Sequence, residues 1–264
     1  MDVATYLERI NYSGSPEPTL DTLRQLQIAH LQAVPFENLD IPLGRQIELT
    51  LESRYQKVVI EQRGGFCYEL NGLFCWLLRE LGFSVSMLAA RVFNGTDFGP
   101  PLDHLLLLVE LDGQEWVTDV GFGDSYREPL RLDETAQEQF AGTYQILPDY
   151  DGLTLYQSRD GEEAKPHYTF TRQTHQLSDY REMCHYQQTS PDSGFTRRQV
   201  CTIATPTGRM TISNGRLITT NLITKEKTEH PITTEPEYRH LLKTHFGIVF
   251  PTNMSLEILL AKQS

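Results

Sequence analysis

The order of hydrophobic and polar residues divides the chain into a helical first third and a strand-rich remainder. Apolar residues recur at helical spacing over residues 3–10, 20–34 and 52–62, and Pro35 ends the second of these segments. The most regular apolar stripe follows Cys67 and consists of Leu70, Leu73, Phe74, Leu77, Leu78 and Leu81. This spacing predicts a helix that begins at about Cys67, packs one face against a core and ends at Gly82.

From residue 85 onward, short β-rich runs alternate with Gly, Pro and Asp residues, a pattern typical of strands and turns. The predicted strands are 87–92, 105–111, 115–120, 143–147, 153–158 and 167–171, followed by 201–205, 210–213 and 216–220. Their regular spacing favours an antiparallel sheet or barrel. Asp112-Gly113 and Asn214-Gly215 are preferred two-residue hairpin turns. Thr234 and Glu237 form a capping box, which predicts a last helix ending at Gly247. The pattern as a whole indicates an α+β fold.

Composition and charge narrow the class of protein. The 264 residues are 39% apolar and 22% charged, which is typical of a soluble globular protein. A net charge of −12 argues against nucleic acid as a partner. Because neither a signal sequence nor a long apolar run is present, we expect no membrane segment. Four cysteines without regular spacing do not indicate a disulfide framework, so a reducing cytoplasm is the expected location.

The segment from Arg63 to Cys67 is the strongest chemical signal in the chain. Gly64 and Gly65 allow the backbone to turn sharply, and a thiol follows at the start of the predicted helix. There the unpaired backbone N–H groups and the helix dipole favour an anion, so the thiol is biased toward the thiolate. A lone intracellular cysteine is more commonly a small buried hydrophobe. A catalytic role for Cys67 therefore requires a partner.

The predicted hairpin over residues 104–123 supplies that partner. If Leu111 pairs with Gln114, then His104 and Asp119 lie on the same face as a diagonal pair, with Cα atoms roughly 7–8 Å apart. Alone, the histidine would more commonly bind a loop carbonyl, and the aspartate could simply stabilise a turn. Together, Cys67, His104 and Asp119 form a set with divided roles. The histidine takes the proton from the thiol and later returns it, and the aspartate fixes the tautomer of the histidine ring.

Other candidate partners are weaker. His30 and His245 lie on apolar helix faces and are expected in the core or at an interface. Cys184 and His185 are neighbours, so in a strand their side chains would point in opposite directions. No pair resembles a CxxC or HxxxH motif, so we expect no metal site.

At these residues the sequence resembles the arylamine N-acetyltransferases, as a prokaryotic-type member. Residues 35–38 resemble the family's PFEN segment, and residues 63–71 match its RGG-aromatic-Cys-aromatic-Glu signature. The segments that begin at His104 and Asp119 match those that hold its histidine and aspartate, and residues 188–196 resemble its TSPxSxFT segment. The four motifs occur in order and extend over most of the chain.

The resemblance implies a fold of three parts: a helical bundle over residues 1–84, a β-barrel over 85–199 and an α/β lid over 200–264. It also implies a papain-like Cys-His-Asp core made by Cys67, His104 and Asp119. The implied reaction is ping-pong transfer of acetyl from acetyl-CoA, through a Cys67 thioester, to an arylamine, hydrazine or N-hydroxyarylamine. No metal is implied, and the protein is expected to be a monomer or homodimer.

Further site residues are implied by the same resemblance. Phe36, Phe66 and Phe122 match aromatic positions that line the acceptor pocket, with ordinary core packing as the alternative. Gly123 and the backbone N–H of Phe66 are implied as oxyanion or acyl contacts. Coenzyme A is implied to contact the segment from Ser190 to Arg198, specifically Ser193, Phe195, Arg197 and Arg198. The two arginines would lie near its phosphates, and a solvated loop is the alternative. Pro100 and Pro101 precede His104 at a place where some eukaryotic members have Thr-Gly near a coenzyme contact. Because proline has no N–H to donate, the coenzyme is expected to bind differently beside these two residues.

Two alternative functions use the same residues. An amide synthase or a thiol hydrolase could apply the triad to another acyl donor, and a non-catalytic binding protein could retain the scaffold. The predicted helix after Thr234 favours a small-molecule transferase over an open protease groove. The unbroken triad argues against a binding protein. The preferred amine and the acyl chain length do not follow from the sequence.

Overall fold

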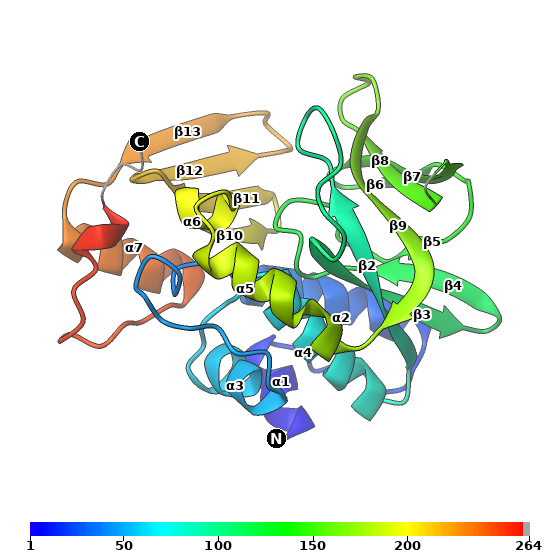
Figure 1. The fold of residues 1–264 in the computed structure, drawn as a ribbon, viewed down its shortest axis with the longest axis horizontal. Helices are drawn as coiled ribbons and strands as arrows, with labels where there is room; N and C mark the ends of the chain where they lie inside the picture. Colours follow the sequence, from blue (N-terminus) through cyan, green and yellow to red (C-terminus); the bar gives the residue numbers. More distant parts are fainter. Residues whose placement is uncertain (151, 261–264) are drawn as a thin grey trace.

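Helices occupy the first part of the chain, as the spacing predicted (Figure 1). The computed structural model describes residues 1–150 and 152–260. Its first helices are α1 (Val3–Arg9), α2 (Leu20–Ala33), α3 (Leu51–Tyr55), which a π-helical turn over Gln56–Ile60 continues, and α4 (Cys67–Glu80). The side chains of Asp2, Thr19 and Thr50 cap the first three by accepting a backbone N–H. The predicted start of a helix at Cys67 is confirmed.

The middle of the chain forms one antiparallel sheet of eight strands. They are β2 (Ser84–Val92), β3 (His104–Leu111), β4 (Gln114–Thr118), β5 (Leu130–Arg131), β6 (Gln137–Gln139), β7 (Gly142–Asp149), β8 (Gly152–Ser158) and β9 (Lys165–His175). Their order is β5-β4-β3-β2-β9-β8-β7-β6, and the sheet curls into a nearly closed form around a core that includes Leu106, Tyr126, Tyr144 and Tyr168. The six longer strands were predicted from the sequence, whereas the short β5 and β6 were not.

The hairpin of β3 and β4 has the predicted register. Leu111 pairs with Gln114, and the pairing continues to Leu107 and Thr118. Asp112 and Gly113 form the two-residue turn with φ of 50° and 73°, the left-handed values that such a turn requires. The strands therefore bring His104, at the start of β3, to the end of β4.

A second antiparallel sheet combines distant parts of the chain. It contains β1 (Phe36–Glu37), β10 (Val200–Thr205), β11 (Gly208–Ser213), β12 (Arg216–Asn221) and β13 (Lys227–Pro231), in that order. Phe36 pairs with Thr202, so the first third of the chain supplies one edge of the C-terminal sheet. The capped helix α7 (Glu235–Phe246) ends at Gly247, whose φ is 70°, and contributes to the same core as this sheet.

Short helices join the two sheets and follow α7. They are the 3₁₀ helix Leu177–Tyr180, α5 (Arg181–Thr189), α6 (Gly194–Arg197) and the 3₁₀ helix Glu257–Leu259. Cys184 thus lies on a helix and not on a strand.

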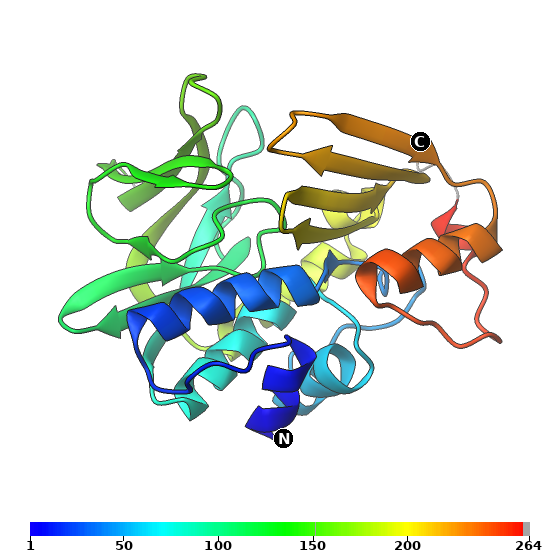
Figure 2. The same ribbon diagram turned by 180° about the vertical axis from the view of Figure 1, so that it is seen from behind.

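The helices connect the two sheets. α4 packs against β2 and β3, and α2 packs against β10 and lies in the foreground of Figure 2, below the two sheets. The division of the chain at residues 84/85 and 199/200 stays a prediction. Among the residues that the structure describes, no helix is both long and apolar enough to cross a membrane.

Candidate active site

The backbone before Cys67 runs unusually close to its neighbours. Cys67 begins α4 and is 3% exposed. A Cβ atom on Gly64 would lie 2.0 Å from the Pro35 carbonyl oxygen, and one on Gly65 would lie 2.7 Å from Glu69 Oε2. The left-handed residue of this turn is Gln62, with φ of 53°. The glycine pair is therefore needed for close approach, which corrects the expectation that it serves a sharp turn.

A buried ion cluster lies beneath this turn and consists of Glu37, Asp40, Lys57, Arg63 and Glu69. Lys57 Nζ lies 2.8 Å from Glu69 Oε1 and 2.7 Å from Asp40 Oδ2. Burial raises the pKa of the Glu69 carboxyl despite this ammonium. Glu69 Oε2 also accepts the Phe66 N–H at 3.2 Å. Because that N–H is engaged, the expectation that it contacts an oxyanion is wrong for this structure.

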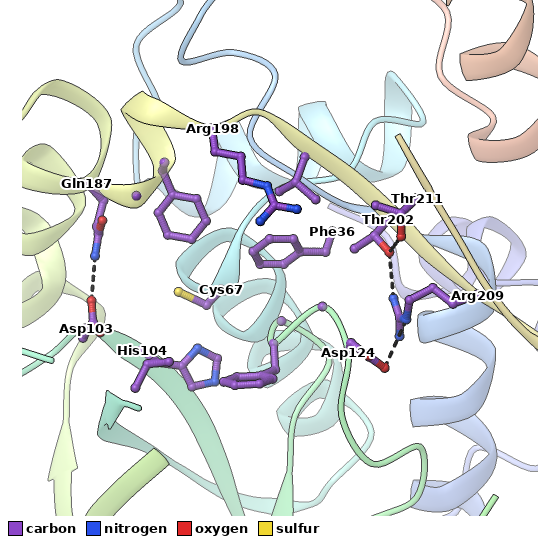
Figure 3. A pocket seen from close by; sticks show the side chains of 17 residues that line it. Phe36, Cys67, Asp103, His104, Asp124, Gln187, Arg198, Thr202, Arg209 and Thr211 are labelled. Carbon is purple, nitrogen blue, oxygen red and sulfur yellow. Dashed lines mark hydrogen bonds and ion pairs between the residues drawn. The ribbon is translucent and has the colours of Figure 1, made fainter. Parts of the chain in front are cut away.

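His104 and Asp119 form the predicted pair. His104 Nε2 lies 2.7 Å from Asp119 Oδ2, and each residue is 3% exposed. The other edge of the imidazole faces Cys67 (Figure 3). Burial alone would lower the pKa of His104, but the Asp119 carboxylate and a hydrogen bond with Cys67 raise it to about 10. His104 therefore holds its proton more tightly than an ordinary histidine does.

Asn71 is a structural part of the site that the sequence analysis missed. Its Nδ2 donates to Asp119 Oδ1 at 2.7 Å and to the Leu105 carbonyl at 2.6 Å, and its Oδ1 accepts the Val120 N–H at 2.9 Å. It is fully buried and lies one helical turn after Cys67. Its amide thus joins α4, β3 and the end of β4. A polar residue four positions after Cys67 is the signal that could have found it.

Two glycines after Asp119 bring the backbone against the site. The Gly121 N–H donates to Asp119 Oδ1 at 2.8 Å, and a Cβ atom on Gly121 would lie 2.8 Å from Cys67 Cα. Gly123 has φ of 92°, a conformation that side chains disfavour, and lines the cavity next to Phe36. The loop after β4 therefore passes directly over the start of α4.

A cavity of about 540 Å³ opens beside Cys67 and His104. Phe36, Phe122 and Phe195 are its aromatic walls. Its size and apolar walls suit a small aromatic ligand. Phe66 does not line it: this side chain is fully buried and packs edge-on against Phe195, with ring centroids 5.7 Å apart. The expectation that Phe66 lines the acceptor pocket is thus corrected to core packing.

The residues expected to contact coenzyme A separate into two groups. Gly123, Phe195 and Arg198 line the cavity. Ser193 is 1% exposed, and its hydroxyl donates to Gln187 Oε1 at 2.6 Å and accepts the Phe195 N–H as the cap of α6. Arg197 lies outside the cavity lining and donates to the Asp192 carbonyl at 2.8 Å. The Ser193 side chain therefore organises the loop and does not face the cavity.

The remaining thiols and the core histidine do not belong to the Cys67–His104–Asp119 set. Cys75, Cys184 and Cys201 are buried and free. Burial raises the pKa of Cys75 to about 11 and of Cys184 to about 12, and raises that of Cys201 well above its ordinary value. His30 is fully buried, as expected for a core residue, and burial lowers its pKa to about 3. Within residues 1–150 and 152–260, no three His, Cys, Asp or Glu side chains cluster as metal ligands.

Comparison with known proteins gives one consistent result. A family model described as N-acetyltransferase matches residues 19–255. The arylamine N-acetyltransferase of Escherichia coli (strain K12) is 38% identical over 213 residues, which cover 79% of this chain and 75% of that protein. The structure of arylamine N-acetyltransferase from Salmonella typhimurium has a TM-score of 0.88 at 31% identity, and the match covers 98% of this chain and 95% of that chain. The structure of the Mycobacterium marinum arylamine N-acetyltransferase in complex with CoA has a TM-score of 0.86 at 32% identity. The match covers 94% of this chain and 93% of that chain.

Proposed function

Because the chain belongs to the arylamine N-acetyltransferase family and is thus an acyltransferase, we propose that it moves acetyl from acetyl-CoA, through Cys67, to the nitrogen of an arylamine, hydrazine or N-hydroxyarylamine. The observation that carries this proposal is the Cys67–His104–Asp119 set beside a cavity with aromatic walls. A thiol that begins a helix, with its histidine on an adjacent sheet, also supports the papain-like character of the core.

In the first half-reaction, the Cys67 thiolate attacks the acetyl carbonyl carbon of acetyl-CoA. A new C–S bond forms, and the bond from the carbonyl carbon to the coenzyme sulfur breaks. The leaving coenzyme thiolate takes the proton that His104 holds, so that free CoA departs as a thiol. The high pKa of His104 supports its role as the resting proton store.

In the second half-reaction, the amine nitrogen attacks the Cys67 thioester. His104, now neutral, accepts the proton that the nitrogen loses, and the C–S bond to Cys67 breaks. The amide leaves, and the thiolate and protonated histidine are restored. Asp119 fixes which ring nitrogen of His104 faces the sulfur, since it binds the other one.

The tetrahedral intermediate of each step carries a negative oxygen that needs donors. The Phe66 N–H is engaged by Glu69, so we assign this role to the first amides of α4, those of Cys67 and Tyr68. Helix geometry leaves them without acceptors in a preceding turn. Gly123 stays a second proposed acyl contact, because it lines the cavity.

The coenzyme is proposed to enter along the loop that contains α6. A relative from Mycobacterium marinum has been solved with CoA bound, which supports acetyl-CoA as the donor. Phe195 lines the cavity, and Arg197 lies beside it with an exposed side chain available for phosphate. Arg197→Gln should raise the KM for acetyl-CoA and leave the KM for S-acetylpantetheine, which lacks the nucleotide phosphates, unchanged. An equal effect on both donors would contradict this contact.

The main test measures the acetyl-enzyme directly. Acetyl-CoA alone should release one equivalent of CoA and add one acetyl group to the protein by intact-mass spectrometry, and Cys67→Ala should abolish both. Addition of 4-aminobenzoate or a hydrazide should then remove the adduct. Release of CoA without a Cys67-dependent adduct would refute the proposed mechanism. Hydrolysis of the adduct at the same rate without an amine would favour the thiol hydrolase.

We further propose a cytoplasmic protein that works as a monomer or homodimer. All four cysteines are free in the structure, which supports a reducing compartment. Sedimentation of the purified protein would give its oligomeric state.

A further inference from the structure

Asp103 places a carboxylate in the cavity wall on the side of Cys67 (Figure 3). The other carboxylate of this wall, Asp124, is held by two arginines. Arg209 Nε lies 3.2 Å from Asp124 Oδ1, and Arg159 Nη2 lies 3.2 Å from its Oδ2. Of the residues that the structure describes, no lysine or arginine pairs with Asp103 in this way. Asp103 is therefore the carboxylate of the cavity that stays available to a ligand.

Hydrogen bonds fix the position of the Asp103 side chain. Its Oδ1 accepts Gln187 Nε2 at 2.6 Å. The Gln187 amide cannot turn over, because its Oε1 accepts the Ser193 hydroxyl at 2.6 Å, and that hydroxyl in turn accepts the Phe195 N–H. Gly99 covers the other oxygen, since a Cβ atom on Gly99 would collide with Asp103 Oδ2. Oδ1 is thus the oxygen that can accept a further hydrogen bond from the cavity.

The backbone of Asp103 is held just as firmly. The hydroxyl of Tyr68, the residue after Cys67 in α4, lies 3.0 Å from the Asp103 carbonyl oxygen and 2.9 Å from that of Leu102. In a continuous strand, the side chains of Asp103 and His104 would point to opposite faces. Asp103 instead lies in the turn before β3, and both side chains lie beside Cys67 in Figure 3. Two groups that can accept an N–H therefore flank the sulfur.

The electrostatics of Asp103 suit one half-reaction more than the other. Burial raises the pKa of its carboxyl, and hydrogen bonds from the Val92 N–H and Gln187, together with the charge of His104, oppose this rise. A carboxylate that has lost its water accepts a hydrogen bond more strongly than one in solvent. Beside Cys67 its charge opposes a thiolate, so it does not assist the first half-reaction. In the second, the attacking nitrogen becomes positive, and a nearby carboxylate stabilises that charge.

We propose, building on the proposed function, that Asp103 is a further catalytic residue, which accepts a hydrogen bond from the attacking amine. A primary amine has two N–H groups, as has the terminal nitrogen of a hydrazide. In the acetyl-enzyme His104 accepts one and Asp103 the other, which directs the nitrogen lone pair at the thioester carbon. As the C–N bond forms, the C–S bond breaks and its electron pair returns to Cys67. One proton moves to His104, the other stays on the amide nitrogen, and Asp103 gains none.

The experiment measures the two half-reactions separately in the wild-type and Asp103→Asn proteins. This substitution removes the charge and keeps an oxygen that can accept Gln187 Nε2. The first half-reaction is followed as CoA release after mixing with acetyl-CoA alone. For the second, the acetyl-enzyme is freed of CoA by gel filtration and mixed with 4-aminobenzamide, an uncharged primary amine. Loss of the acetyl group is followed by intact-mass spectrometry over a range of amine concentrations.

Asp103→Asn should lower the maximal rate of the second half-reaction about ten- to hundredfold, as expected when a hydrogen bond to a charged group is lost. It should not slow the first half-reaction, because the charge that it removes opposes the thiolate. A merely structural role would give a different result, since displacement of His104 slows both half-reactions.

Gln187→Met tests the orientation of the carboxylate. It removes the donor that fixes Asp103 Oδ1, while the Ser193 hydroxyl keeps the Gln187 backbone carbonyl as an acceptor at 2.9 Å. The second half-reaction should slow by less than in Asp103→Asn. The matched control is Asp112→Asn, the same change of charge at the exposed turn of the β3–β4 hairpin, where φ is 50° and asparagine is well tolerated. It should leave both half-reactions unchanged.

Equal slowing of both half-reactions by Asp103→Asn overturns the proposal. So does an unchanged maximal rate of the second half-reaction, even if the variant then needs more amine. If Asp103→Asn does not fold, Gln187→Met decides, and an unslowed second half-reaction in that variant overturns the proposal. Failure of the proposed function looks different, because the wild-type protein then takes up no acetyl group from acetyl-CoA, and the role of Asp103 falls with it.

Discussion

Replacing Gly121 by alanine should damage catalysis far more than it damages folding. The loop after β4 carries Asp119 over the first turn of α4, and Gly121 is the point of closest contact. A methyl group there would lie 2.8 Å from the backbone atom Cys67 Cα and 2.8 Å from the side-chain atom Asn71 Nδ2. The backbone atom cannot move without the helix, and Asn71 Nδ2 cannot move aside without breaking its hydrogen bonds to Asp119 and Leu105.

The size of the effect follows from these distances. Carbon atoms normally meet at about 3.5 Å, so the loop and the helix must separate by about 0.7 Å. A misplacement of about 1 Å in an active site can cost roughly 10²-fold in rate. We therefore expect kcat/KM to fall on the order of 10²-fold. Overpacking of this kind typically destabilises a protein by about 1–3 kcal/mol.

The assay must distinguish displacement of the active-site residues from a lower free energy of unfolding. Ile248→Val removes one buried methyl group from the core beside α7 and should cost about 0.5–1.5 kcal/mol. Both variants are compared by urea unfolding, by CoA release and by alkylation of Cys67 with iodoacetamide. The control should keep near-normal kinetics, whereas Gly121→Ala should lose turnover and show slower alkylation. Near-normal turnover and alkylation in folded Gly121→Ala would refute the close-approach argument.

Three further predictions follow from the buried groups. The Asp119 carboxylate and the hydrogen bond with Cys67 raise the pKa of His104 to about 10, so its ring should stay protonated when an NMR titration passes through the ordinary histidine pKa of about 6.5. A midpoint near 6.5 would contradict the pairing of His104 with Asp119. Asn71→Ala leaves the Val120 N–H without its acceptor and removes a donor from Asp119. It should lower the free energy of unfolding in urea by at least about 2 kcal/mol and kcat by at least about tenfold. An unchanged unfolding midpoint would exclude Asn71 as the residue that joins α4 to the loop after β4. Burial lowers the pKa of His30 in the native protein to about 3, below its value of about 6.5 in the unfolded chain. As the pH drops between these two values, the unfolded state binds the proton first, so the free energy of unfolding should fall by up to about 1.4 kcal/mol per pH unit. His30→Leu should make the free energy of unfolding less dependent on pH in this window.

The hairpin shows how much of the site the sequence contains. A two-residue turn at Asp112-Gly113 fixes the register of its strands, and the alternation of side chains then places His104 and Asp119 on one face. This inference needs only local information. Asn71 lay within the predicted helix, but its three partners come from β3 and the loop after β4. Its role could not be predicted before the packing of α4 on β3 was known.

Pairings between distant segments explain most of what the sequence did not predict. Phe36 pairs with Thr202, and no local pattern links two residues so far apart in the chain. The helix α5 stayed unpredicted because its sequence, Arg181 to Thr189, is largely polar and has no apolar stripe. Phe66 and Ser193 lie at the expected places in the chain, yet their side chains face inward, and only the tertiary structure determines that direction.

The side chains of the site come from two parts of the fold. Cys67, His104 and Asp119 come from α4 and the eight-stranded sheet, which Asn71 joins through buried hydrogen bonds. Arg209 belongs to β11 of the C-terminal sheet, and Arg198 lies two residues before β10 of the same sheet. β1 of the C-terminal sheet contacts the turn before Cys67, where the Glu37 N–H donates to the Gly65 carbonyl, whereas β11 contributes Arg209 to the cavity wall. Charge changes on β11 should therefore act on the cavity and leave the contacts between Cys67, His104 and Asp119 in place.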